Sequence, residues 1–63
     1  MTLFESIRLM IMNKNNRYKS KIDNTEQYNI FKKDIEKKMS LFLRNEKLTQ
    51  NEYDELFGIL LNV

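Results

Sequence analysis

The chain has 63 residues, with 11 Lys or Arg against 9 Asp or Glu, and it contains no Cys, no His and no Pro. The absence of Cys and His excludes a disulfide framework, a zinc finger, and thiol or imidazole chemistry. So short a chain forms one small domain over residues 1–63, and no apolar run approaches the roughly 20 residues that cross a bilayer. The start lacks a basic segment before its apolar residues, so we expect a cytosolic protein without a secretory signal.

The first predicted helix covers residues 3–20. Thr2, followed by Glu5 three residues later, fits a capping box at its start. A core-facing stripe is predicted from apolar residues at helical spacing, continued at the same period beyond residue 12: Leu3, Phe4, Ile7, Met10, Ile11, Tyr18 and Ile22. Lys14 interrupts this stripe, and Asn is a weak helix former. The sequence therefore does not decide whether residues 13–24 form helix or loop.

The second predicted helix covers residues 25–44. The polar run Asp23-Asn24-Thr25 marks its start, and Glu26 puts negative charge into the first turn. A regular apolar stripe follows, formed by Tyr28, Phe31, Ile35, Met39 and Phe42. Asp34 and Lys38, four residues apart, form a predicted ion pair on the opposite face.

The third predicted helix covers residues 50–62. Thr49 and Glu52 form a second capping box, with Leu48 and Tyr53 as a hydrophobic staple. The predicted apolar face consists of Tyr53, Leu56, Phe57, Leu60 and Leu61. Gly58 lies opposite, and we expect the helix to fray from there unless something covers it. The fold class is therefore all-α, a three-helix domain whose second and third helices form an antiparallel αα-hairpin.

Several apolar residues lie off these stripes and form the candidate partner-binding set. They are Leu9, Met12, Ile30, Leu41, Ile59 and Val63. Soluble monomers rarely expose large contiguous apolar patches. We therefore expect some of them, with Leu9 and Met12 or Ile30 and Leu41 as anchors, to contact a larger protein or a second copy in a homodimer.

The charge is uneven along the chain. Residues 1–22 carry five basic side chains and one acidic one, a net charge of +4, whereas the rest carries six basic and eight acidic side chains, a net of −2. An alternative function is therefore nucleic-acid binding by a basic segment around an aromatic ring: Lys14, Arg17, Tyr18, Lys19 and Lys21. The opposing explanation is a solvated helix end whose cations complement the helix dipole.

Other functions find little support in the residues. A helix-turn-helix would need a basic recognition helix, but the third segment opens with Glu52, Asp54 and Glu55 and contains no Lys or Arg. Glu52 and Glu55 could form a carboxylate pair, yet capping already explains Glu52. So short a domain also leaves little room for a substrate pocket. We expect no enzyme, no cofactor, no metal, no small-molecule substrate and no membrane attachment.

Codon usage and size suggest a class of protein. The chain has 8 Asn, 8 Lys and 6 Ile and no Ala, a bias typical of genomes with low GC content. It resembles the small accessory proteins of phages and mobile elements in low-GC Gram-positive bacteria, and such proteins often bind and block one host protein. The stretch from Lys47 to Leu56 is similar to the Leu-Thr-x-x-Glu-[Tyr/Phe] helix starts of many small bacterial helical domains. We therefore interpret the chain as a protein-binding regulator or inhibitor.

Overall fold

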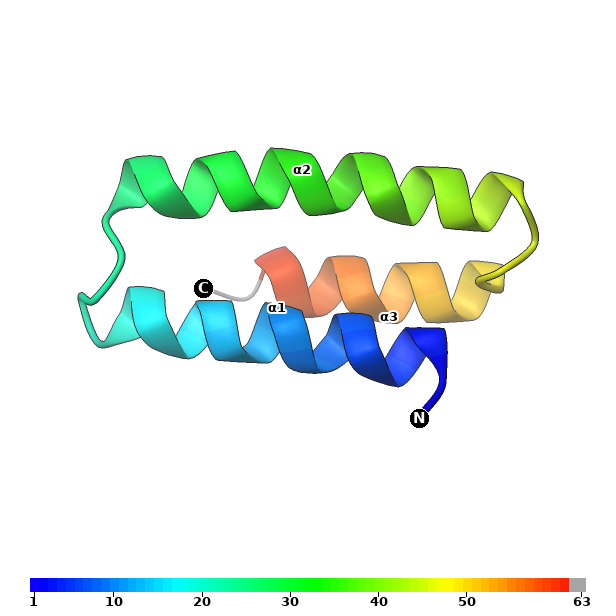
Figure 1. Cartoon of the computed structure of the whole chain (residues 1–63), viewed down its shortest axis with the longest axis horizontal. Coiled ribbons are helices and arrows are strands. Elements are labelled where there is room, and N and C mark those ends of the chain that lie inside the picture. Colours follow the sequence, from blue (N-terminus) through cyan, green and yellow to red (C-terminus); the bar gives the residue numbers. More distant parts are fainter. Residues whose placement is uncertain (62–63) are drawn as a thin grey trace.

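The computed structural model describes residues 1–61, which form three helices joined by short turns. They are α1 (Leu3–Lys19), α2 (Thr25–Arg44) and α3 (Gln50–Leu61). Figure 1 shows α2 running antiparallel to both α1 and α3, and residues 1–61 contain no strand. The all-α class and the antiparallel α2–α3 hairpin are confirmed. The predicted bounds agree with α2 and differ by one residue at the end of α1, while position 62 lies outside the described residues.

Short polar side chains begin each helix by binding backbone N–H groups that have no partner within the helix. Thr49 and Glu52 form the predicted capping box, with Thr49 N donating to Glu52 Oε1 at 2.9 Å and Glu52 N to Thr49 Oγ1 at 3.1 Å. At Thr2 only half of the box forms, because Glu5 accepts from the Thr2 hydroxyl. Helix α2 is capped by Asn24 in a reciprocal box with Gln27, which sequence reasoning did not foresee.

Helices α1 and α2 end in the same tight turn, in which one residue adopts a left-handed conformation. Lys21 has φ 62° and Glu46 has φ 60°. After α1, Ile22 N donates to Arg17 O, and after α2, Lys47 N donates to Phe42 O, at 2.9 and 2.8 Å. This pattern is the Schellman motif, in which glycine normally takes the left-handed position. Residues 13–19 are thus helix, and the loop is confined to residues 20–24.

The core lies where the three apolar stripes meet. Its buried residues are Ile7, Ile11, Tyr28, Ile35, Met39, Leu48, Leu56 and Leu60. Three residues of the predicted stripes are instead exposed: Met10 (47%), Ile22 (63%) and Leu61 (54%). Ile22 lies in the turn after α1, where helical periodicity no longer applies, and Met10 lies at the edge of its stripe. Ile59, which we expected off the main face, packs against the core.

The last turn of α3 remains helical through Gly58 to Leu61. Fraying was expected unless this end were covered, and it is covered, since Leu60 is fully buried. Gly58 itself faces open space. Val63, the remaining off-face apolar residue, lies outside the described residues. No helix within residues 1–61 combines the length and the apolar character that a bilayer span requires.

Candidate functional site

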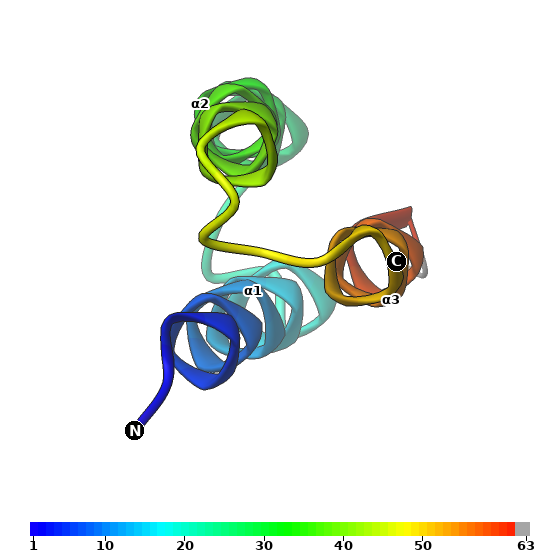
Figure 2. The same ribbon diagram turned by 90° about the vertical axis from the view of Figure 1, so that its right-hand side faces the viewer.

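The four predicted partner-binding anchors are all exposed. Leu9, Met12, Ile30 and Leu41 keep 46%, 40%, 64% and 51% of their surface accessible. They do not form one patch, however. Leu9 lies about 200° around α1 from the buried Ile7, and Ile30 lies about 140° around α2 from the buried Ile35. Because α1 and α2 face one another across the core, their outer faces point in different directions (Figure 2).

Leu41 differs from the other three anchors because it borders a groove between α2 and α3. The groove has a volume of about 620 Å³. Its α3 side is formed by Tyr53 and Phe57, whose rings stack at a centroid distance of 6.1 Å and an angle of 17°. Both rings are half-buried and pack against the core. The apolar surface of the groove thus combines a fixed aromatic pair with an exposed aliphatic side chain.

The α2 side of this groove carries positive charge. Lys33, Lys37 and Arg44 line it, with Glu36 as the acidic residue of the lining. Among residues 1–61, none of the three cations lies within ion-pair distance of a carboxylate. By contrast, Lys38 on another face of α2 pairs with Asp34 at 3.1 Å, as the sequence predicted. The groove is therefore an apolar surface with a cationic edge that the described fold leaves unneutralised.

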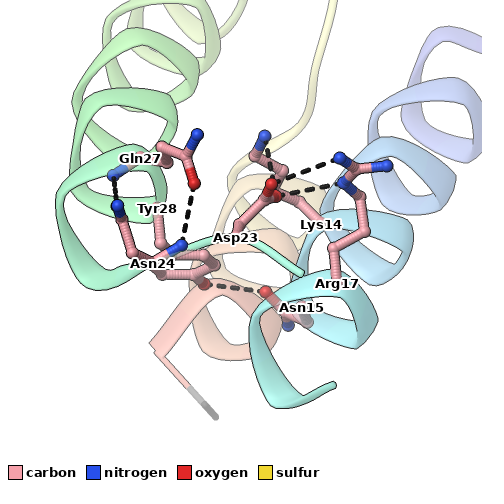
Figure 3. A network of polar contacts seen from close by, with 7 residues as sticks. All are labelled: Lys14, Asn15, Arg17, Asp23, Asn24, Gln27 and Tyr28. Carbon is pink, nitrogen blue, oxygen red and sulfur yellow. Dashed lines mark hydrogen bonds and ion pairs between the residues drawn. The ribbon is translucent and has the colours of Figure 1, made fainter. Parts of the chain in front are cut away.

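The predicted basic segment is largely occupied by contacts within the chain (Figure 3). Asp23, only 5% exposed, accepts two hydrogen bonds from Arg17 at 3.1 and 3.2 Å and pairs with Lys14 Nζ at 3.0 Å. These hydrogen bonds, first that of Arg17 and then that of Lys14, hold the pKa of Asp23 below its ordinary value. The charges of Lys14 and Arg17, which could contact phosphate, instead bind Asp23 and stabilise the turn between α1 and α2.

The aromatic residue of that segment is also engaged. Tyr18 stacks on Tyr28 at a centroid distance of 4.8 Å, and its hydroxyl lies 3.2 Å from Thr25 Oγ1. Lys19 and Lys21 remain exposed, with no ion pair among the described residues. The structure therefore brings Lys14, Arg17 and Tyr18 together as part of the α1–α2 junction and leaves two separate lysines on the surface.

Sequence reasoning missed a buried polar network at the end of α3. Asn15, 6% exposed, donates from Nδ2 to Ile59 O at 3.0 Å. The Tyr28 hydroxyl shares its proton between Asn15 Oδ1 at 2.7 Å, a contact drawn in Figure 3, and Leu60 O at 2.8 Å. Burial, with a smaller contribution from Tyr18, raises the pKa of Tyr28. The signal was available, since Asn15 follows Ile7 and Ile11 at helical spacing on the predicted stripe.

The network has a structural function. Two carbonyl groups in the last described turn of α3, those of Ile59 and Leu60, receive hydrogen bonds from Asn15 of α1 and Tyr28 of α2. At the start of α3, the Glu52 carboxylate also binds within the chain, because it accepts a hydrogen bond from Thr49 N.

Comparison with protein-family models, with curated proteins and with solved structures found no match for this chain. The α2–α3 groove is therefore the candidate site on geometry alone.

Proposed function

We propose that this chain is a small protein-interaction module, a regulator or inhibitor that docks on a larger protein through the groove between α2 and α3. One observation carries the proposal: the groove joins exposed Leu41 and a half-buried aromatic pair to three cations without a carboxylate partner among residues 1–61. Aromatic residues and Arg are enriched at the centres of protein interfaces.

The dimensions of the groove favour a macromolecule over a small ligand. From Lys33 to Arg44 the cationic edge extends for about 16 Å along α2, or three helical turns. An extended groove of this kind suits recognition of a helix, in which anchors recur along one face. The size and codon bias of the chain, similar to those of phage and mobile-element accessory proteins, support a role in binding a host protein.

Nucleic-acid binding through residues 14–21 receives less support from the geometry. Three of its five candidate residues, Lys14, Arg17 and Tyr18, have partners within the chain. If this alternative were correct, affinity for a fluorescent oligonucleotide would fall steeply with salt. It would also fall on Lys19→Glu or Lys21→Glu.

The experiment compares four immobilised proteins as bait for a lysate of the source organism. These are the wild type, Leu41→Lys in the groove, and the matched variants Met12→Lys and Leu9→Lys on the outer face of α1, which contributes no residue to the groove lining. Because all three positions are exposed, each variant is expected to keep its fold, which circular dichroism checks. Quantitative mass spectrometry then identifies proteins lost from a single variant.

We expect one protein that Leu41→Lys fails to capture while the other three baits retain it. Calorimetry with that purified protein should show saturable binding with the same dependence on Leu41. The proposal is wrong if no captured protein depends on any of the three positions. It is also wrong if binding depends on Leu9 or Met12 and not on Leu41.

A further inference from the structure

We propose that the occupant of the α2–α3 groove is an acidic amphipathic helix of the partner protein. Its apolar face would lie against Leu41, Tyr53 and Phe57, and its carboxylates against the cationic edge of α2. This inference rests on the proposed function and deepens it by naming the chemistry of the partner.

Charge complementarity identifies the occupant as acidic. Three cations elsewhere are paired within the chain, since Lys14 and Arg17 bind Asp23 and Lys38 binds Asp34, whereas others, such as Lys19 and Lys21, stand alone on the surface of the described residues. The groove differs from these because it gathers three unpaired cations beside an apolar surface. The three cations of the groove edge have no such partner among residues 1–61, and Glu36 is the acidic residue of the lining. An occupant with carboxylates along one edge would supply the missing charge, and electrostatic complementarity of this kind gives specificity and a fast association rate.

The spacing of the cations identifies the occupant as a helix. Lys33, Lys37 and Arg44 lie at positions i, i+4 and i+11 of α2, so they share one face and rise by about 6 and 10 Å. A second helix alongside α2 repeats with the same rise, so that carboxylates at the same spacing would meet all three. The lining residues of the groove come from α2 and α3 and none from α1, which Figure 2 shows as the third side of the bundle.

Other occupants fit the groove less well. A second copy would bring the same three cations into the contact and double the unneutralised charge. A nucleic acid would place phosphates near Glu36 and near the acidic start of α3, where Asp54 and Glu55 are exposed.

The test selects peptides from a displayed library of helical sequences about 18 residues long, or about 27 Å of helix. Immobilised full-length protein is the bait, and the charge-neutral variant Leu41→Asn removes peptides that bind elsewhere without favouring either sign of peptide charge. We expect the enriched peptides to carry net negative charge, with apolar residues at spacings of three and four. Their affinity should fall at least tenfold on Lys37→Glu and on Leu41→Lys. The matched control is Arg8→Glu, an exposed cation of α1 with no ion pair among residues 1–61, which should leave the affinity nearly unchanged.

The outcomes separate this inference from the function beneath it. Enrichment of basic or uncharged peptides, or no groove-dependent enrichment, overturns the acidic helix. The proposed function still stands in that case if a lysate protein requires Leu41. The acidic helix is also overturned if a fluorescent single-stranded RNA binds the wild type and this binding disappears in Lys37→Glu. A dimer that Leu41→Lys dissociates would overturn it as well. If no library peptide and no lysate protein depends on the groove, both proposals fall.

Discussion

Replacing Tyr28 by Phe should weaken the fold through the loss of one hydroxyl group. Phe retains the ring and its stacking on Tyr18, so the change isolates the hydrogen bonds. The hydroxyl supplies the proton for two buried acceptors, Asn15 Oδ1 and Leu60 O. Burying acceptors without a donor costs about 1–3 kcal/mol each, and since one proton served both, we expect a loss of about 2 kcal/mol.

That loss is large for a protein of this size. A domain of 63 residues has roughly 3–9 kcal/mol of stability, so about 2 kcal/mol removes a substantial part of it. For small domains the melting temperature falls by about 4–8 °C for each kcal/mol, which gives roughly 8–16 °C here. Urea denaturation followed by circular dichroism measures the change, and the slope with denaturant should stay the same.

Two further measurements make the reasoning refutable. In a double-mutant cycle with Asn15→Ala, the two losses should fail to add, because both variants break one network. A loss below about 0.5 kcal/mol, the range of ordinary surface substitutions, or simple additivity would refute the network's contribution. In addition, the raised pKa of Tyr28 means that stability is present below the unfolded value of 10.0 and is lost as the pH rises above it. Tyr28→Phe should lack this alkaline loss.

Glu46→Gly should raise the free energy of unfolding by about 0.5–1 kcal/mol in urea melts, because glycine adopts the left-handed φ of 60° found at position 46 without a side-chain clash. Glu46→Ala should give no gain. Gly58→Ala should stabilise by about 1 kcal/mol, because the added methyl group meets open space and only helix propensity changes; a loss of stability would show a contact there. The advantage of the wild type over Asp23→Asn in melting temperature should be full above pH 3.8 and disappear as the pH falls through the lowered pKa of Asp23; an advantage that persists at lower pH would refute the ion pair as its source. If the exposed anchors pair two copies, melting temperature should rise with protein concentration and Ile30→Lys or Leu41→Lys should lower the sedimenting mass; a monomer mass at all concentrations would exclude the homodimer.

Local patterns in the sequence were sufficient to predict the helices. The stripe from Tyr28 to Phe42 and the capping box of Thr49 and Glu52 each depend on residues within a few turns, so their spacing specifies them. The exposure of Leu9 and Ile30 followed from the same periodicity. Each of these features depends only on the residues of a single helix.

The remaining features depend on which helices meet and could not be predicted from periodicity. The groove arises because Tyr53 and Phe57 of α3 lie beside the Lys33–Arg44 edge of α2. Its cations looked like an ordinary solvated helix face in the sequence. The position of Asn15 on the α1 stripe indicated its burial, whereas its hydrogen-bond partners on α2 and α3 could not be predicted from periodicity. The number and the faces of the helices were predictable, and the side chains that join different helices were not.

The hydrogen bonds that complete α3 have a consequence for folding kinetics. They span 44 residues from Asn15 to Ile59 and 32 residues from Tyr28 to Leu60. Contacts between residues so distant in the chain form only when α3 docks against α1 and α2, and our hypothesis is that this docking follows the rate-limiting step. Substitutions in this network should then accelerate unfolding and leave the refolding rate nearly unchanged. The lifetime of the folded molecule, rather than the speed at which it forms, would depend on one asparagine and one tyrosine.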